Sequence, residues 1–324
     1  MSAKPKVIVT RRLPAPVETA LRERFSVELS ARDEPTDPDI LQRALGRADG
    51  LLSTVTDKLT AEVLSAYPIR TRIIANFGVG YDNIDVGAAQ AHEITVTNTP
   101  DVLTDCTADL AMTLIQMTLR RAGEGERELR SGRWSGWRPT HLMGTRVTGR
   151  VLGLVGMGRI ARAVAHRAHH GFGMRILCYD PSPPSPVELA ALEAEPRSTL
   201  EALLGESDVV SLHCPSTPAT RGMMNAARLA QMKPGAFLIN TARGDVIDDD
   251  ALIAALGSGR LAGAGLDVFR GEPKFDQRYL GLENAVLLPH LGSATRETRE
   301  AMGFRAIDNL AAFFDGRPVP DQVA

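Results

Sequence analysis

Short runs of β-branched and aliphatic residues alternate along most of the chain with stretches whose apolar residues recur at helical spacing. Such runs are typical of strands buried on both faces of a parallel sheet, and the stretches between them of the covering helices. A first series predicts strands at residues 6–10, 26–29, 50–53, 72–76 and 94–97. A second predicts strands at residues 151–155, 175–179, 209–212, 236–240, 263–266 and 285–288. The pattern therefore predicts an α/β fold with two strand series.

Two long helical stretches mark the organisation of the chain. Residues 101–121 separate the two strand series, and residues 296–314 follow the second. Residues 123–149 form a looser, polar segment that contains glycine and both tryptophans. The length of 324 residues also favours two domains, because one domain takes ~150 residues.

Composition excludes several classes of protein. Apolar residues make up 44% and charged residues 23%, which argues against a disordered chain. The net charge of −2 gives no basic field for nucleic acid, and no apolar run approaches the ~20 residues that span a bilayer. The N-terminus lacks the features of a signal peptide, and three widely spaced cysteines favour neither disulfides nor a metal site. We therefore expect a cytoplasmic protein without metal, membrane or nucleic acid partners.

One segment matches the dinucleotide-binding fingerprint G-x-G-x-x-G/A between a predicted strand and a predicted helix, which is the context that the motif requires. Gly156 permits the tight turn, Gly158 lets the backbone approach a pyrophosphate, and Ala161 keeps helix and strand close. Arg159 and Ile160 open the helix, whose N-terminus offers N–H groups and a positive dipole end to phosphates. A plain strand–helix turn is the alternative interpretation.

An acidic residue stands at the end of the next predicted strand. Asp180 follows Gly158 by 22 residues, close to the ~20 expected for a carboxylate that binds the ribose hydroxyls of NAD. No arginine or lysine occurs between Asp180 and Glu195 to bind the 2′-phosphate of NADP. The sequence therefore predicts NAD(H) in preference to NADP(H).

Three polar segments each follow a strand of the second series, and they carry Arg243, Glu272 and His290. Ligands of open α/β sheets bind at the carboxyl ends of strands, which favours a site here. Each residue alone has another interpretation, namely a surface ion pair for Arg243, a turn for Glu272 and a core histidine for His290. Periodicity and spacing do not join the three residues into one site.

Further motifs recur in order along the chain. Residues 76–85 form a Gly-Val-Gly loop, residues 97–110 begin Thr-Asn-Thr-Pro-Asp, and residues 132–139 contain both tryptophans. Together with the glycine fingerprint and the three polar segments, this order resembles the D-2-hydroxyacid dehydrogenase family, most closely its glyoxylate/hydroxypyruvate reductase branch. The resemblance extends from about Gly50 to Thr295.

The resemblance implies two Rossmann-like, doubly wound parallel-sheet domains with the active site in the cleft between them. The substrate domain is expected to be discontinuous and to comprise residues 1–99 plus 293–324, with the NAD-binding domain at residues 100–292. Members of the family are usually homodimers built through the cofactor domains, so we expect a homodimer.

The resemblance also implies residue roles. His290 is expected to be the general acid of reduction, Glu272 to pair with it, and Arg243 to bind the substrate's carboxylate and carbonyl. Further substrate contacts are expected from Val79, Gly80, Leu52 and the partner subunit's Trp137. Further cofactor contacts are expected from Thr104, Pro215, Thr241, Ala242, Asp267, His290 and Gly292.

These expectations favour NADH-dependent reduction of a small 2-keto acid, such as glyoxylate or hydroxypyruvate, to the D-2-hydroxy acid. Residues 51–56 contain no arginine, which counts against a phosphorylated substrate. A longer, apolar keto acid is an alternative substrate. A NAD-sensing corepressor or scaffold on the same fold is the alternative function, against which the tryptophan-containing segment counts.

Overall fold

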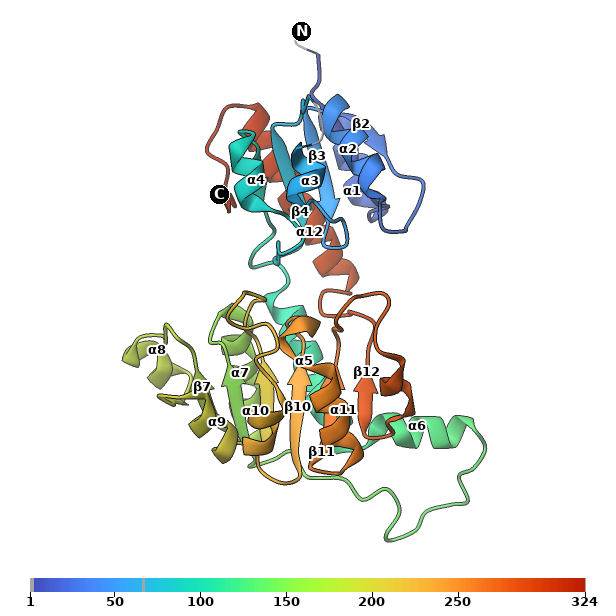
Figure 1. The fold of residues 1–324 in the computed structure, drawn as a ribbon, viewed down its shortest axis with the longest axis vertical. Coiled ribbons are helices and arrows are strands. Elements are labelled where there is room, and N and C mark those ends of the chain that lie inside the picture. Colours follow the sequence, from blue (N-terminus) through green and yellow to red (C-terminus); the bar gives the residue numbers. More distant parts are fainter. Residues whose placement is uncertain (1–2, 66–67, 324) are drawn as a thin grey trace. The chain divides into compact units, whose positions relative to one another are not determined.

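The computed structural model describes residues 3–65 and 68–323, and the chain divides into two compact units (Figure 1). Unit 1 comprises Met1–Leu103 and Ala294–Ala324, and unit 2 comprises Thr104–Ser293. The boundaries expected from the sequence lie four residues earlier at the first crossing and one residue earlier at the second. Unit 1 is thus assembled from both ends of the chain.

Unit 1 contains a five-stranded sheet in the order β2-β1-β3-β4-β5, in which every neighbouring pair is parallel. The strands are β1 (Lys6–Val9), β2 (Ser26–Leu29), β3 (Gly50–Thr54), β4 (Ile73–Phe77) and β5 (Thr95–Thr97). The apolar runs of the first series predicted each of them to within one residue. These runs identify the strands because both faces of the sheet are covered.

The helices of unit 1 are α1 (Ala15–Arg24), α2 (Pro38–Arg47), α3 (Ala61–Ser65), α4 (Val86–Ala91) and α12 (Arg296–Phe314). The C-terminal helix α12 packs against β4 and α1. Its Gly303 meets Val17 of α1 so closely that a Cβ atom at position 303 would lie 2.4 Å from Val17 Cγ2. Asn309 of α12 also donates to the carbonyl of Asn98. These contacts show where the last predicted helix packs, which its sequence alone does not.

Unit 2 contains a seven-stranded parallel sheet in the order β12-β11-β10-β9-β6-β7-β8. The strands are β6 (Val151–Val155), β7 (Arg175–Tyr179), β8 (Ala194–Pro196), β9 (Val209–Leu212), β10 (Ala236–Asn240), β11 (Leu261–Leu266) and β12 (Ala285–Leu287). The sequence did not predict β8, because an edge strand of three residues that contains glutamate and proline shows no apolar run. The two parallel sheets confirm the predicted α/β class.

Helices and 3₁₀ turns surround this second sheet. They are α5 (Thr104–Leu119), α6 (Ala122–Arg130), α7 (Arg159–Phe172), α8 (Pro186–Ala191), α9 (Leu200–Glu206), α10 (Ala226–Gln231), η1 (Gly244–Val246), α11 (Asp249–Gly257) and η2 (Gln277–Gly281). Arg121 adopts a left-handed conformation with φ 53° and ends the predicted helix 101–121 before α6 begins. Among the described residues, no helix combines the length and apolar character needed to cross a bilayer.

The core of unit 2 lies on both faces of its sheet, as β10 illustrates. Phe237 and Ile239 pack in the cluster that contains residues of α5 and α7. Leu238 points to the opposite cluster, with residues of α9, α10 and α11. Successive side chains of a strand point to opposite faces, so a strand covered on both sides is apolar throughout. Because all neighbouring strands of this sheet are parallel, their carboxyl ends lie along one edge.

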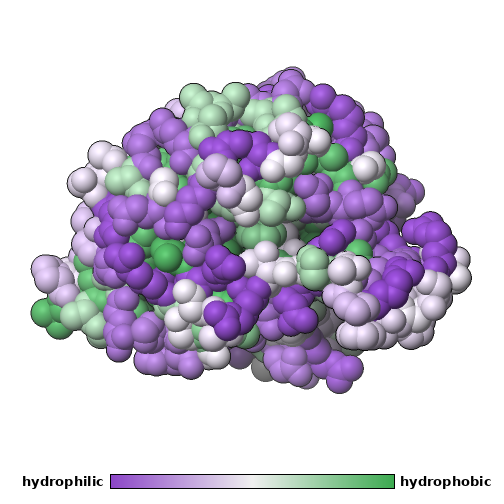
Figure 2. All heavy atoms as spheres, turned by 90° about the horizontal axis from the view of Figure 1, so that it is seen from below, coloured by the Kyte–Doolittle hydropathy of each residue, from purple (hydrophilic) through white to green (hydrophobic). Residues whose placement is uncertain are grey.

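An extended segment leaves the amino-terminal edge of the sheet. We call α6 together with residues 131–149 the arm, and it projects from the body of unit 2 (Figure 1). His141 on the arm lies 2.7 Å from Glu128 of α6, which ties the segment back to the helix. Figure 2 looks from below onto this end of the unit, where hydrophobic residues form separate patches among hydrophilic ones. Large apolar side chains exposed on the arm are Leu129, Trp134, Trp137 and Met143.

Substitution of Gly303 tests the close packing of α12 on α1. Gly303→Ala forces Val17 or the helix to move, and we expect a loss of about 1–3 kcal/mol in the free energy of unfolding. Urea unfolding followed by circular dichroism measures it. Gly171→Ala in α7 is the matched control, because no atom lies within 4 Å of the added Cβ. That variant should be unchanged or more stable by up to about 1 kcal/mol. Equal stability of both variants would contradict the packing.

Candidate active site

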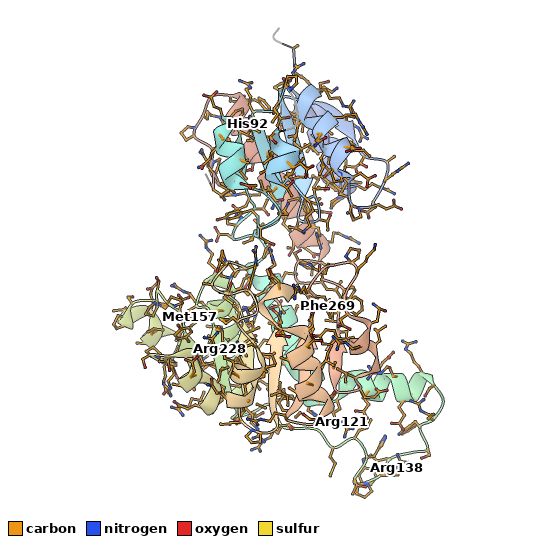
Figure 3. The ribbon with its side chains drawn as sticks, in the orientation of Figure 1. His92, Arg121, Arg138, Met157, Arg228 and Phe269 are labelled. Carbon is orange, nitrogen blue, oxygen red and sulfur yellow. The ribbon has the colours of Figure 1, made fainter. Side chains whose placement is uncertain are left out.

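The polar residues singled out in the sequence gather at the carboxyl edge of the second sheet. From β6 the chain proceeds through β7 to β8 on one side, and from β9 through β10 to β12 on the other. The point where the strand order reverses is the usual ligand crevice of such sheets. Figure 3 shows Met157 and Phe269, which follow β6 and β11, at this edge, and Arg121 and Arg138 toward the opposite edge. The loops after β6, β9, β10, β11 and β12 therefore form the candidate site.

The loop after β6 has the geometry of a phosphate-binding turn. Gly156 has φ +87°, and a Cβ atom there would lie 2.9 Å from the backbone of His213 in the loop after β9. Gly158 is the N-cap of α7, and a Cβ atom there would meet no atom within 4 Å. Arg159 and Ile160 form the first turn of the helix. The open space before the first N–H groups of α7 suits a pyrophosphate, so this loop fits a dinucleotide.

Asp180 lies beside the glycine loop, directly after β7. Its Oδ2 accepts a hydrogen bond of 2.7 Å from Met157 N–H, and its Oδ1 accepts one of 2.8 Å from Ser182 N–H. The loop and the acid are thus held together by direct contact. This is the arrangement in which a carboxylate receives the ribose hydroxyls of a bound dinucleotide.

His290 and Glu272 form a hydrogen-bonded pair. His290 Nδ1 lies 2.8 Å from Glu272 Oε2, and Glu272 Oε1 accepts from Phe269 N–H at 2.7 Å. Burial opposes ionisation of Glu272, but the hydrogen bond and charge of His290, the Phe269 N–H and the charge of Arg243 together lower its pKa. An ionised Glu272 accepts a hydrogen bond from Nδ1–H of His290, and Nε2 of the ring is then the nitrogen that can exchange a proton with a ligand.

The turn that carries His290 is clamped by a buried carboxylate. Asp267, 1% exposed, accepts from Leu291 N–H at 2.6 Å and from Gly292 N–H at 2.8 Å. Burial raises the pKa of Asp267, and these two N–H groups oppose the rise. Thr107 of α5 donates to the carbonyl of Gly292 at 2.9 Å. Because both carboxylate oxygens already accept backbone bonds, Asp267 positions the histidine turn before any contact with a cofactor.

Arg243 stands in a turn that a buried asparagine closes. Asn240 donates from Nδ2 to the carbonyl of Arg243 at 2.8 Å and accepts from Ala242 N–H at 3.0 Å. The next residue, Gly244, touches the loop after β11 so closely that a Cβ atom would lie 1.9 Å from the carbonyl carbon of Phe269. The loops that carry Arg243 and Glu272 therefore pack together, and Thr241 and Ala242 belong to the same turn.

Two other cofactor residues expected from the sequence lie in unit 2 with fewer contacts. Thr104 is the first residue of α5. Pro215 follows β9, and its carbonyl accepts from Thr220 Oγ1 at 2.6 Å. Nearby, burial lowers the pKa of His213 to about 4, so this histidine is neutral near pH 7. Within the described residues, no cluster of three or more histidine, cysteine or acidic side chains could hold a metal ion.

In unit 1, the loop after β4 presents two backbone N–H groups. Asn76 Nδ2 donates to the carbonyl of Gly80 and Asn98 Nδ2 to that of Val79, each at 2.8 Å. The carbonyls of these two residues are thus occupied, whereas their N–H groups donate no hydrogen bond within the described part of unit 1. Neither Asn76 nor Asn98 has a role among the expectations from the sequence. The signal it does contain is an asparagine at the end of a buried strand, directly before a glycine-rich loop.

The structure corrects the expectation for Leu52. This residue lies in the middle of β3, paired with Val9 and Ala75, and its side chain is 0% exposed. Its carbonyl accepts from Thr10 N–H at 3.1 Å. A central strand is covered on both faces, so its side chains pack in the core and offer no surface to a substrate.

Trp137 lies on the arm and is 82% exposed. Neighbouring Arg138 marks the outer part of the arm in Figure 3. Within unit 2 the arm leaves the sheet at its amino-terminal edge, opposite to the loops that carry Arg243 and His290. Trp137 therefore takes no part in the candidate site of its own unit.

Similarity to known proteins extends over nearly the whole chain. Residues 112–292 match the family described as D-isomer specific 2-hydroxyacid dehydrogenase, NAD binding domain. The chain is 46% identical over 324 residues to a glyoxylate reductase of Thermococcus kodakarensis, covering 99% of this chain and 96% of that protein. It resembles the crystal structure of a putative D-isomer specific 2-hydroxyacid dehydrogenase of Polaromonas sp., with a TM-score of 0.92, 41% identity and coverage of 99% and 100%.

A further solved structure bears on the choice of cofactor. It is an NADPH-dependent glyoxylate/hydroxypyruvate reductase of Sinorhizobium meliloti, in complex with NADP and malonate. Its TM-score is 0.87 and its identity 36%, with coverage of 99% of this chain and 97% of that one. Similarity at this level therefore does not establish whether this chain prefers NAD or NADP. That preference has to be inferred from the residues of this chain.

The Glu272–His290 pair predicts a pH-dependent contribution to stability. The pKa of Glu272 is lowered in the folded protein relative to the unfolded value of 4.5, so the stabilisation is complete above pH 4.5 and is lost as pH falls through the folded pKa. Glu272→Gln should therefore cost about 1 kcal/mol near pH 7 and less near pH 4. Urea unfolding at both pH values measures this difference.

Glu283→Gln is the control for this comparison, because Glu283 forms an exposed pair with Arg127. Its cost should stay within about 0.5 kcal/mol. A cost for Glu272→Gln that does not fall as the pH is lowered below 4.5, where Glu272 itself gains a proton, would refute the assignment of an ionised, histidine-bound Glu272.

Proposed function

Because the chain belongs to the D-isomer specific 2-hydroxyacid dehydrogenase family and is an oxidoreductase, we propose that it reduces a small 2-keto acid to the D-2-hydroxy acid. Glyoxylate and hydroxypyruvate are the first candidate substrates, since the T. kodakarensis relative is named glyoxylate reductase and the S. meliloti relative glyoxylate/hydroxypyruvate reductase. The observation that carries the proposal is the Glu272–His290 pair beside Arg243 at the carboxyl edge of the sheet.

Each group of this site has a defined task in the proposed reaction. His290 donates a proton from Nε2 to the carbonyl oxygen as negative charge develops on it, and receives a proton in the reverse direction. Glu272 holds the ring through Nδ1 and stabilises its protonated form. Arg243 binds the carboxylate of the substrate through its planar guanidinium group. In unit 1, the N–H groups of Val79 and Gly80 are the proposed further donors to that carboxylate.

The proposed cofactor is NAD(H), preferred over NADP(H). When bound, the dinucleotide supplies or accepts the hydride. Gly156, Gly158, Arg159 and Ile160 would hold its pyrophosphate, and Asp180 its adenosine ribose. The loops at the nicotinamide end would contribute Thr241, Ala242, Asp267, His290 and Gly292, with Thr104 and Pro215 nearby.

We further propose that the protein is a homodimer in the cytoplasm. The arm exposes four large apolar side chains, of which Trp137 is the most accessible. Exposed apolar surface of this extent commonly marks an interface with another protein. A second copy of the chain would cover it, and the partner subunit's Trp137 would reach the substrate.

The proposed location in the cytoplasm has separate support. The three cysteines are free thiols, which suits a reducing compartment.

The proposed activity is tested with purified protein, NADH and a panel of glyoxylate, hydroxypyruvate, pyruvate and 2-oxoisocaproate, followed by the absorbance of NADH. Glyoxylate or hydroxypyruvate should be reduced fastest. His290→Asn should lower kcat by about 10²–10⁴-fold, because positioned acid catalysis contributes this much, with NADH affinity nearly unchanged. Activity of this variant within about threefold of the parent protein would overturn the role of His290. Absence of turnover despite NADH binding would favour the sensor alternative.

The dimer proposal is tested by sedimentation and by kinetics of Trp137→Ala. We expect the parent protein to sediment as a dimer and the variant to show a KM for the keto acid raised by about tenfold, with the KM for NADH unchanged. Trp134→Ala, on the same arm, is the matched control without an assigned substrate contact. A monomeric parent protein, or equal kinetics for both variants, would contradict the proposal.

A further inference from the structure

Arg162 links the glycine loop to α8. This residue lies in the first turn of α7, and its Nε donates to the carbonyl of Met157 at 3.1 Å. Its Nη1 donates to Glu188 Oε1 at 2.7 Å. The guanidinium group is thus held between the loop that would bind a pyrophosphate and the helix that follows Asp180. A cation at this place has a neighbour of opposite charge but stays 38% exposed to solvent.

Glu188 is fixed by a second set of contacts. Its Oε2 accepts from the backbone N–H of Ser185 at 2.9 Å and from Ser185 Oγ at 2.8 Å. The first of these bonds and the bond from Glu188 N–H to Ser185 Oγ, at 3.3 Å, form the capping box of α8. The hydrogen bonds from Ser185, followed by that from Arg162, lower the pKa of Glu188 to about 2. Its carboxylate is therefore charged, and each of its two oxygens has its own partner. Glu188 neutralises Arg162 without leaving its place in the cap.

Met157 connects this pair with the acid expected to bind ribose. Its N–H donates to Asp180 and its carbonyl accepts from Arg162, so a carboxylate and a guanidinium group lie on either side of one residue. In Rossmann domains that bind NAD, a carboxylate at the position of Asp180 accepts a hydrogen bond from the ribose 2′-hydroxyl. In those that bind NADP, an arginine nearby accommodates the 2′-phosphate. Arg162 and Asp180 both bond to the backbone of Met157, which places the arginine on the same loop as the acid proposed to bind the ribose.

We propose that Arg162 is a latent receptor for the 2′-phosphate of NADP(H), and that Glu188 masks it. In this arrangement Asp180 repels the 2′-phosphate, while Glu188 occupies the guanidinium group of Arg162. The cofactor preference then depends on two carboxylates rather than one. The inference rests on the proposed dinucleotide site and adds a determinant to it. The absence of basic residues after Asp180 does not reveal this determinant, because Arg162 precedes Asp180 in the chain.

The test compares dissociation constants of NADH and NADPH, measured by fluorescence titration. Glu188→Gln removes the masking charge but keeps the cap, since glutamine also serves in a capping box. We expect NADPH to bind about three- to tenfold more tightly and NADH to change by less than about twofold, because exposed ion pairs are screened and act weakly. Asp180→Ala/Glu188→Gln should gain more for NADPH and lose affinity for NADH.

The role of Arg162 is isolated by adding Arg162→Met to Glu188→Gln. This second change should abolish the gain for NADPH and leave NADH binding as it was. Two matched controls each remove one charge of an exposed ion pair formed by another residue of α7. Glu193→Gln removes a carboxylate that pairs with His169 beyond α8, and Arg167→Met removes a guanidinium group farther along α7 that pairs with Asp105 and Asp109. Neither should alter the ratio of the two affinities.

The outcomes separate this inference from the function beneath it. Failure of the parent protein to bind NADH would overturn the proposed dinucleotide site itself. Normal NADH binding with unchanged NADPH affinity in Glu188→Gln would overturn only the masking role. A gain that persists in Arg162→Met/Glu188→Gln, or that Glu193→Gln reproduces, would assign the effect to general charge and overturn Arg162 as the receptor.

Discussion

Two backbone N–H groups, those of Leu291 and Gly292, donate to the buried carboxylate of Asp267, and the turn that carries His290 depends on this pair of bonds. The backbone of Asp267 extends the connection, because its N–H donates to Asn240 at the end of β10 and its carbonyl accepts from His290 N–H. The ends of three neighbouring strands are joined in this way. The histidine, its glutamate and the arginine can keep a fixed geometry because they stand on one hydrogen-bonded edge rather than on independent loops.

Side-chain amides serve the same purpose in both units. Asn240 binds the carbonyl three residues further on, and Asn76 binds the carbonyl four residues further on. Each asparagine is buried near the end of a central strand, and each closes a turn that carries groups proposed to bind a carboxylate. Such an amide satisfies a carbonyl that the end of the strand leaves unpaired, and it thereby orients the neighbouring N–H groups or side chain outward. In both units a buried asparagine therefore closes the turn after a strand by the same kind of hydrogen bond.

Apolar runs predicted every described strand except β8, because the other parallel strands are buried on both faces. The glycine fingerprint predicted the turn after β6. The same burial explains the error at Leu52, since a residue beside a ligand loop can still point into the core. The bond between Glu272 and His290 joins residues 18 apart, and Thr107 reaches Gly292 across 185 residues. No local pattern encodes such contacts. For these residues the sequence alone supplied only resemblance, and the structure supplied the geometry within unit 2.

The division of unit 1 between the two ends of the chain has a consequence for biosynthesis. Helix α12 covers β4 and packs on α1, and Asn309 binds the carbonyl of Asn98. Unit 2 is continuous from Thr104 to Ser293, so it can fold on the ribosome as soon as its own last strand has emerged. The part of unit 1 before Thr104 cannot complete its packing until α12 has been synthesised, because α12 covers β4 and α1. During translation the protein therefore passes through a stage in which the part of unit 1 that α12 covers is exposed.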